Sequence, residues 1–115
     1  MSKVEPRSVN QRNFYRIEYP VIERPRFISD DKKEYEVLDI SEKGMRLLKN
    51  EDAPLETGST LQGSVKLHTA GKVNVVGKII RDTEDSLAVM LHVGIQFSLI
   101  INEQQYLQQL NKYID

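Results

Sequence analysis

Two arginines and a short acidic segment carry the side chains best suited to binding a ligand. The arginines are Arg12 and Arg16, and the acidic segment contains Asp39, Ser41 and Gly44. A guanidinium group offers paired N–H donors that match a phosphate or the O6/N7 edge of guanine. A carboxylate can accept hydrogen bonds from guanine N1 and N2, and a hydroxyl can donate to a phosphate. Together these residue types indicate a ligand that is anionic and contains guanine.

Each group also has an ordinary structural explanation. Arginines at this spacing are common, and Arg12 and Arg16 could be solvated side chains beside an edge strand. Asp39 and Ser41 could form an Asx or Ser turn between two hairpin strands, with their polar atoms satisfied by local amides. A binding site requires in addition that the two groups share one hollow.

The alternation of apolar and polar residues predicts how the acidic segment is presented. Over residues 34–41 it predicts a strand that turns Leu38 and Ile40 to the core. The opposite face then carries four side chains: Tyr35, Val37, Asp39 and Ser41. The two polar members of that face should project outward together. They stand beside a turn ending at Gly44, which we expect in a backbone conformation that a side chain would resist.

Further strands complete a predicted β structure. Alternating apolar residues predict strands over 61–67, 73–79 and 87–97. Gly77 and Gly94 interrupt these runs and indicate bulges or tight corners. Pro20 and Pro25 permit only an irregular first strand, because proline cannot donate to a ladder.

The last segment has the period of an amphipathic helix, which we expect to begin near Asn102 because Gln105 completes a capping box. The predicted fold is mainly β, a six-stranded antiparallel β-barrel with a C-terminal α-helix, since closure removes exposed strand edges. Residues 1–11 are polar and lack periodicity. We therefore expect a flexible N-terminal arm over 1–11 and one domain over 12–115.

Composition argues against several classes of protein. The chain has 115 residues, one domain's worth, and a formal net charge of −1, which argues against coating long nucleic acid. It has no cysteine and only two histidines, so neither a disulfide framework nor a metal site is expected. Nothing resembles a catalytic set, so we do not expect an enzyme. Without a long apolar run or a secretory signal, the sequence predicts a cytoplasmic protein that does not insert into membranes.

The order of these features resembles the PilZ family of bacterial second-messenger receptors, over roughly residues 11–114. Both ligand motifs of that family are intact: RxxxR as Arg12 and Arg16, and DxSxxG as Asp39, Ser41 and Gly44. A valine-rich barrel separates the second motif from Val93–Phe97, which precedes the terminal helix. The resemblance implies a PilZ-like barrel, a bacterial cytoplasmic location and no cofactor.

The resemblance also implies binding of cyclic dimeric GMP (c-di-GMP). Arg12 and Arg16 would clamp phosphates and guanine Hoogsteen edges, Asp39 and Ser41 would read a guanine edge, and Gly44 would supply the turn. Family members that bind two ligand molecules often carry an arginine before RxxxR, where this chain has Gln11. Gln11 is therefore a further candidate contact, and the ligand stoichiometry stays open.

Three functions remain to be distinguished on this basis. The first is a receptor whose arginine arm orders on binding c-di-GMP and changes the surface offered to an unidentified effector protein or to a second copy in a homodimer. The second is a PilZ-like interaction adaptor that acts without nucleotide. The third is a small barrel that binds single-stranded nucleic acid, which is disfavoured by the net charge and by the few aromatics near arginines.

Overall fold

The computed structural model of this protein describes residues 15–114, and side chains as far as residue 110. The expected arm over 1–11 and the candidate residue Arg12 lie outside this range. Within the described residues there are seven strands, one 3-10 turn and one α-helix. In chain order they are β1 (Ile17–Glu18), η1 (Val21–Glu23), β2 (Arg26–Ser29), β3 (Glu34–Ile40), β4 (Gly44–Leu48), β5 (Thr60–Leu67), β6 (Gly71–Asp82), β7 (Ser86–Val93) and α2 (Phe97–Ile114).

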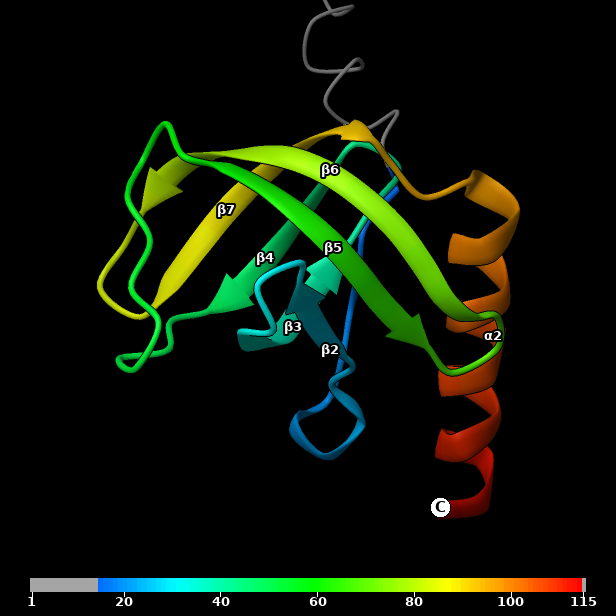
Figure 1. Cartoon of the computed structure of the whole chain (residues 1–115). Helices are drawn as coiled ribbons and strands as arrows, with labels where there is room; N and C mark the ends of the chain where they lie inside the picture. The colour runs from blue at the N-terminus through cyan, green and yellow to red at the C-terminus, as the bar shows by residue number, and fades with distance from the viewer. Residues whose placement is uncertain (1–14, 115) are drawn as a thin grey trace, which may run out of the picture.

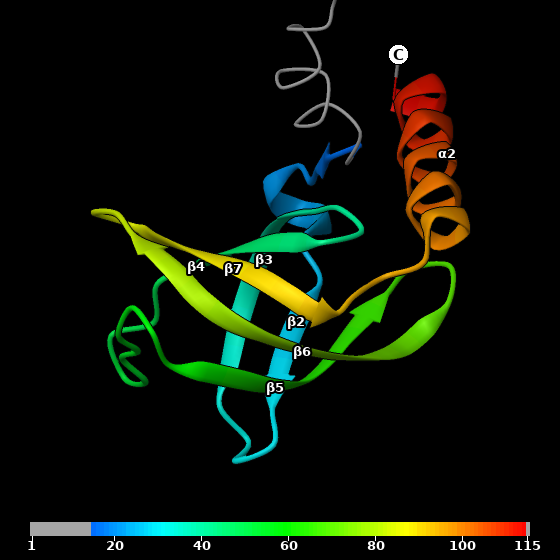
Figure 2. The ribbon, with the colours of Figure 1, turned by 90° about the horizontal axis from the view of Figure 1, so that it is seen from above.

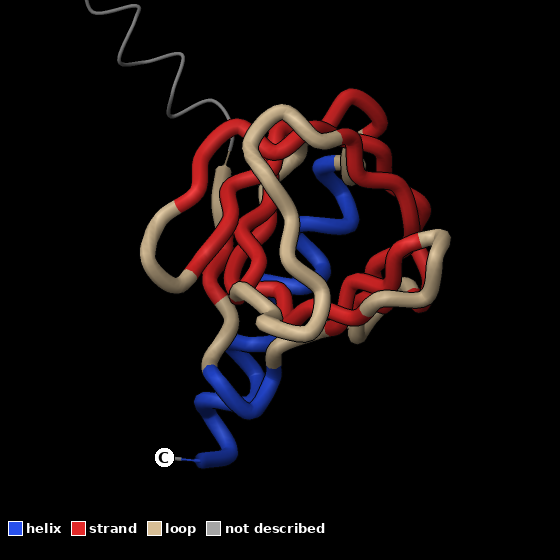
Figure 3. The backbone as a smooth tube through the Cα atoms, turned by 60° about the vertical axis from the view of Figure 1, so that its left-hand side comes forward, coloured by secondary structure: helices blue, strands red, loops and turns tan. Residues whose placement is uncertain are grey.

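Six of the strands close into a barrel. The hydrogen-bonded order is β3-β2-β5-β6-β7-β4, every pairing is antiparallel, and β4 pairs back onto β3 to complete the ring. Figure 3 shows these strands surrounding one interior, and Figure 1 shows α2 standing beside them. The predicted six-stranded antiparallel barrel with a C-terminal helix is therefore confirmed.

The irregular first strand is two short strands on the same edge of β3. β1 pairs through Ile17 with Ile40, and β2 pairs further along the same strand. The 3-10 turn η1 separates them, between Pro20 and Pro25. The Pro25 carbonyl still accepts a hydrogen bond from the Val37 amide at 2.9 Å, because proline lacks only the donor.

A bulge in β3 changes the predicted facing of its side chains. The register shifts between Val37 and Asp39, so Leu38 is the extra residue. Before the bulge, Tyr35 and Val37 are buried in the core, and the prediction that they face outward is wrong. After it, Ile40 is fully buried as predicted. The extra residue resets the two-residue alternation, which no count of apolar residues along the strand can detect.

Helix α2 begins at Phe97, earlier than the predicted start at Asn102. The third apolar run correspondingly ends its strand at Val93. The buried Ile95 follows in the connection, and Ile100 is fully buried in the first turns of the helix. Burial of these two side chains against the barrel outweighs the local capping signal, because tertiary packing contributes most of a helix's stability. Figure 2 shows α2 alongside the barrel, connected to the end of β7. Within residues 15–114, we find no helix with the length and apolar character required for a membrane span.

Candidate ligand-binding site

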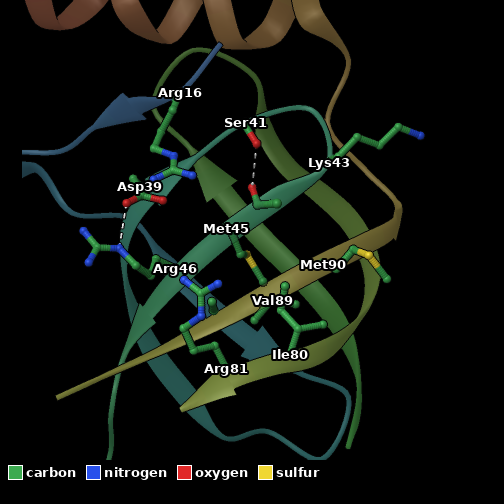
Figure 4. A pocket seen from close by; sticks show the side chains of 12 residues that line it. Arg16, Asp39, Ser41, Lys43, Met45, Arg46, Ile80, Arg81, Val89 and Met90 are labelled. Atoms are coloured by element: carbon green, nitrogen blue, oxygen red, sulfur yellow. Dashed lines mark hydrogen bonds and ion pairs between the residues drawn. The ribbon is translucent and has the colours of Figure 1, made fainter. Parts of the chain in front are cut away.

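The described motif residues meet in one hollow on the outside of the barrel. It has a volume of about 410 Å³ and is lined by all four of them: Arg16, Asp39, Ser41 and Gly44. Figure 4 shows the side chains of Arg16, Asp39 and Ser41 together with those from the neighbouring strands. We call this hollow the Asp39 pocket. The two sequence motifs therefore share a place in the fold as far as the structure describes them, while Arg12 and Gln11 lie outside the described residues.

The short strand β1 carries Arg16 to the pocket. Its two residues pair with the end of β3, Ile17 opposite Ile40 and Glu18 opposite Asp39. Arg16 comes directly before this ladder and its side chain is exposed. The segment is also held from the other side, because the Gln104 amide of α2 donates a hydrogen bond to the Tyr15 hydroxyl. Arg16 is thus an exposed cation placed next to a carboxylate-bearing strand.

Asp39 is a buried carboxylate with an arginine partner. The Nε of Arg46 donates to Asp39 Oδ2 at 2.8 Å, across the β3–β4 ladder in which the two residues face each other. The Asp39 side chain is 4% exposed and that of Arg46 is 42% exposed. A buried charge needs such a partner, because its desolvation is otherwise uncompensated. Arg46 itself lines the pocket, and its side chain stays partly uncovered there.

Arg46 was missed in the reading of the sequence, although a signal for it was present. It stands between Met45 and Leu47, and both of these are core residues. Strand alternation therefore turns Arg46 away from the core, toward the face that carries Asp39. The pattern of apolar and polar residues could not predict the β3–β4 register, which sets Arg46 opposite Asp39.

Ser41 and Gly44 form the turn beside the carboxylate. The Ser41 amide donates to the Gly44 carbonyl at 2.9 Å, and the Ser41 hydroxyl lies 3.4 Å from the same oxygen. The local-turn explanation therefore accounts for these bonds, even though both residues also line the pocket. The expectation of an unusual backbone at Gly44 is wrong, since the positive-φ glycines of the described chain are Gly58 and Gly71. Gly44 instead allows close approach, because an added Cβ would lie 3.3 Å from the Val89 carbonyl oxygen.

The pocket is strongly basic although the chain is not. Four cationic side chains line it, from Arg16, Lys43, Arg46 and Arg81, against the single carboxylate of Asp39. The whole chain has a formal net charge of −1. Basic side chains converging on one hollow concentrate a positive potential there and favour an anion with several charged oxygens.

Arg81 is a further pocket residue that the sequence pattern did not identify. It lies within β6, opposite Ala88 of β7. A register shift between Ile79 and Arg81 makes Ile80 the extra residue of a second bulge. Both Ile80 and Arg81 are exposed and both line the pocket. A bulge presents two consecutive side chains on one face, which regular alternation forbids.

A second cluster of polar groups lies away from the pocket, where α2 meets the barrel. Glu103 of α2 is fully buried and accepts from the Tyr19 hydroxyl at 2.5 Å, from the Thr69 hydroxyl at 2.7 Å and from the Thr69 amide at 2.8 Å. The His68 amide adds a longer bond at 3.3 Å. We call these four residues the Glu103 cluster. Burial and the neighbouring carboxylate raise the pKa of Tyr19 far above its usual value.

The Glu103 cluster was also missed in the reading of the sequence. Its signal is the position of Glu103 three and four residues before Tyr106 and Leu107, which places all three on one face of the predicted helix. The carboxylate is satisfied by neutral donors inside the structure and does not line the Asp39 pocket. Among residues 15–110, no group of three metal-ligating side chains comes together there or elsewhere.

The described part of the chain has the fold of several solved proteins. It is 20% identical to YcgR of Escherichia coli in complex with c-di-GMP, with a TM-score of 0.58 over 90% of this chain and 47% of that one. It is 14% identical to the inhibitor of motility MotI/DgrA of Bacillus subtilis, with a TM-score of 0.60 over 89% of this chain and 52% of that one. This chain therefore spans about half the length of each. No curated protein matches the sequence.

A structure of the PilZ domain of YcgR with c-di-GMP matches over nearly its whole length. It is 18% identical, with a TM-score of 0.58 over 90% of this chain and 94% of that one. The family model described as "PilZ domain" matches residues 10–115, almost the entire sequence. With the barrel, the helix and the two motifs, this match shows that the chain belongs to the PilZ domain family.

Proposed function

We propose that this chain is a receptor for c-di-GMP and has no catalytic activity of its own. The observation that carries the proposal is the composition of the Asp39 pocket, in which the described residues of both motifs share one hollow with four cationic side chains. Structures of YcgR and of its PilZ domain contain c-di-GMP, and both share the fold of this chain. A cyclic dinucleotide presents two phosphates and two guanines, and these are the groups that arginine, carboxylate and hydroxyl side chains recognise.

In this proposal different pocket residues contact different groups of the cyclic dinucleotide. Arg16 and Arg12 clamp phosphates and the Hoogsteen edges of guanine. Asp39, oriented by Arg46, accepts from guanine N1 and N2, and the turn at Ser41 and Gly44 lets backbone approach the ligand. Gln11 stands before the first arginine and makes a weaker contact than an arginine would.

Ordering of the arm transmits the binding event. The ladder that brings Arg16 to the pocket is only the two residues of β1, so few backbone bonds oppose a movement of the preceding segment. When the arginines close over the anion, residues 1–16 change the surface offered to an effector protein or to a second copy of the chain. Amide hydrogen exchange over 1–16 should slow on addition of c-di-GMP, and unchanged exchange at saturation would refute the arm mechanism while leaving the receptor intact.

Calorimetric titration with c-di-GMP tests the receptor itself. We expect Arg16→Ala and Arg12→Ala each to cost about 1.5–3 kcal/mol of binding free energy, the range for hydrogen bonds to charged groups. Arg26→Ala is a matched control, because Arg26 is an exposed arginine of β2 that pairs with Glu34 and does not line the pocket. A folded wild-type protein that releases no heat with c-di-GMP would favour the adaptor that acts without nucleotide.

A further inference from the structure

The wall of the Asp39 pocket away from the carboxylate is apolar and uncovered. Ile80 and Met90 line it and are 49% and 41% exposed. Ala88 lies beside them and also lines the pocket. Figure 4 shows Ile80 and Met90 on the opposite side of the view from Asp39. We call this apolar wall, which consists of Ile80, Ala88 and Met90, the Ala88 floor. Isolated exposed apolar residues are ordinary, but two that share one wall of a basic hollow with a half-buried alanine call for an explanation.

The strand registers show how the floor is built. Ala88 of β7 lies opposite Arg46 of β4 on one side and opposite Arg81 of β6 on the other. This row thus reads arginine, alanine, arginine across three strands. The short alanine side chain leaves a depression between two guanidinium groups.

The next row continues the depression. Met90 lies opposite Gly44 on one side, and glycine has no side chain to cover it. On its other side Met90 lies opposite Lys78, and the bulge of β6 brings the unpaired Ile80 onto the same face as Arg81, where both line the pocket. The result is an open apolar strip with guanidinium groups beside it and the polar motif residues at its far end.

This shape fits the face of a purine ring. Base faces stack on apolar side chains and on guanidinium planes, and such stacking does not depend on which base is present. The thioether of Met90 is flexible and polarisable, which suits contact with an aromatic ring. By contrast, Asp39 can only interact with the hydrogen-bonding edge of a base.

We propose that the Ala88 floor is a stacking position for one purine of the bound cyclic dinucleotide. The proposal rests on the proposed function and adds to it a second kind of contact with the ligand. The motif residues read phosphates and base edges, while Ile80 and Met90 contribute affinity through the base face. They are contact residues specific to the outer face of β6 and β7 and lie outside both sequence motifs.

Proton and carbon NMR of the methionine methyl groups tests the contact directly. The chain has three methionines, so the Met90 methyl can be assigned by its loss in Met90→Leu. Saturation with c-di-GMP should move the Met90 methyl proton signal upfield, since a stacked purine shields it, and should move the Met45 signal less, because Met45 also lines the pocket but is buried. A Met90 signal that stays in place while the wild-type protein releases binding heat would overturn the proposal.

Affinity provides the second measurement. The double variant Ile80→Ser/Met90→Ser should bind c-di-GMP at least roughly tenfold more weakly, because stacking contributes about 1–3 kcal/mol per base. Val93→Ser is the matched control, since Val93 is a 54% exposed apolar residue at the end of β7 that does not line the pocket. Equal affinity of the double variant and the control for c-di-GMP would overturn the proposal that the Ala88 floor is a stacking position. Absence of binding heat from the wild-type protein would instead overturn the proposal that the chain is a c-di-GMP receptor.

Discussion

Two buried carboxylates, Asp39 and Glu103, differ in what satisfies them. Glu103 is fully buried and receives neutral donors from Tyr19, Thr69 and the His68 amide. Within the described residues, Asp39 receives one side-chain donor, from Arg46, whose own side chain is 42% exposed beside an open hollow. A carboxylate has about four acceptor positions, so Glu103 is saturated by its own fold while Asp39 retains capacity. The comparison separates a carboxylate that holds the structure together from one that is available to a ligand.

The largest expected effect is on stability, at Glu103. We expect Glu103→Ala to lower the free energy of unfolding by about 3 kcal/mol, because it leaves the buried donors of Tyr19 and Thr69 unsatisfied. Urea unfolding measures this loss, and Gln105→Ala, at an exposed position of the same helix, is the control. Binding of c-di-GMP should be nearly unchanged in the folded variant. A stability loss below that of the control variant would mean that Glu103 does not anchor α2.

The matching change at Asp39 should act mainly on the ligand. We expect Asp39→Ala to weaken c-di-GMP binding by about 2 kcal/mol, since one accepting group for guanine is lost. The free energy of unfolding should fall by only about 1 kcal/mol, because the half-exposed Arg46 can be rehydrated. Calorimetry and urea unfolding on one preparation give both numbers. If stability fell as much as for Glu103→Ala while affinity held, Asp39 would be a structural carboxylate too.

Alkaline pH should weaken the Glu103 cluster. Burial raises the pKa of Tyr19 above its usual value of 10.0, so the folded state keeps the phenol protonated where the unfolded chain ionises. The stabilising contribution is therefore complete below pH 10 and is lost as pH rises above it. Above pH 10, Tyr19 can lower the free energy of unfolding by up to about 1.4 kcal/mol per pH unit. Urea unfolding between pH 8 and 11 should show a shallower decline for Tyr19→Phe than for the wild type; parallel curves would contradict the assignment.

The smallest effect is expected for an exposed ion pair. Arg26 and Glu34 lie 3.3 Å apart with side chains 57% and 56% exposed. We expect Arg26→Ala to change the free energy of unfolding by less than about 0.5 kcal/mol, because water and salt screen such pairs. Arg46→Ala, which leaves Asp39 buried without this partner, should cost at least about 1 kcal/mol. Equal losses of unfolding free energy in the two variants would show that the burial of Asp39 does not determine how much its ion pair with Arg46 contributes to stability.

The barrel and helix were predictable because each depends on local periodicity. Alternation along the later strands places Val65, Val75 and Val89 in the core, where all three are buried. The motif residues were identifiable for a related reason, since guanidinium, carboxylate and hydroxyl groups limit the ligands that they can bind. Boundaries were less predictable, as the early start of α2 shows, because Ile95 and Ile100 gain their stability from contacts with distant strands.

The cross-strand register and the bulges at Leu38 and Ile80 were beyond the reach of the sequence, although the irregularity predicted at Gly77 coincides with a register shift between Val76 and Gly77. The extra residues Leu38 and Ile80 reset the facing of β3 and β6, and with it the places of the buried Asp39 and the exposed Arg81 in the pocket. Arg46 gained its role only through its place opposite Asp39, and Glu103 through contacts with strands distant in the chain.

The amino-acid sequence by itself determined which chemical groups the proposed binding site has and that they are carried on a closed β structure. Tertiary structure alone decided that Arg46, Arg81 and an apolar floor join them, and that Glu103 is saturated elsewhere. The physical reason is that side-chain chemistry and periodicity are properties of neighbouring residues, whereas cross-strand partners depend on a register that one extra residue shifts.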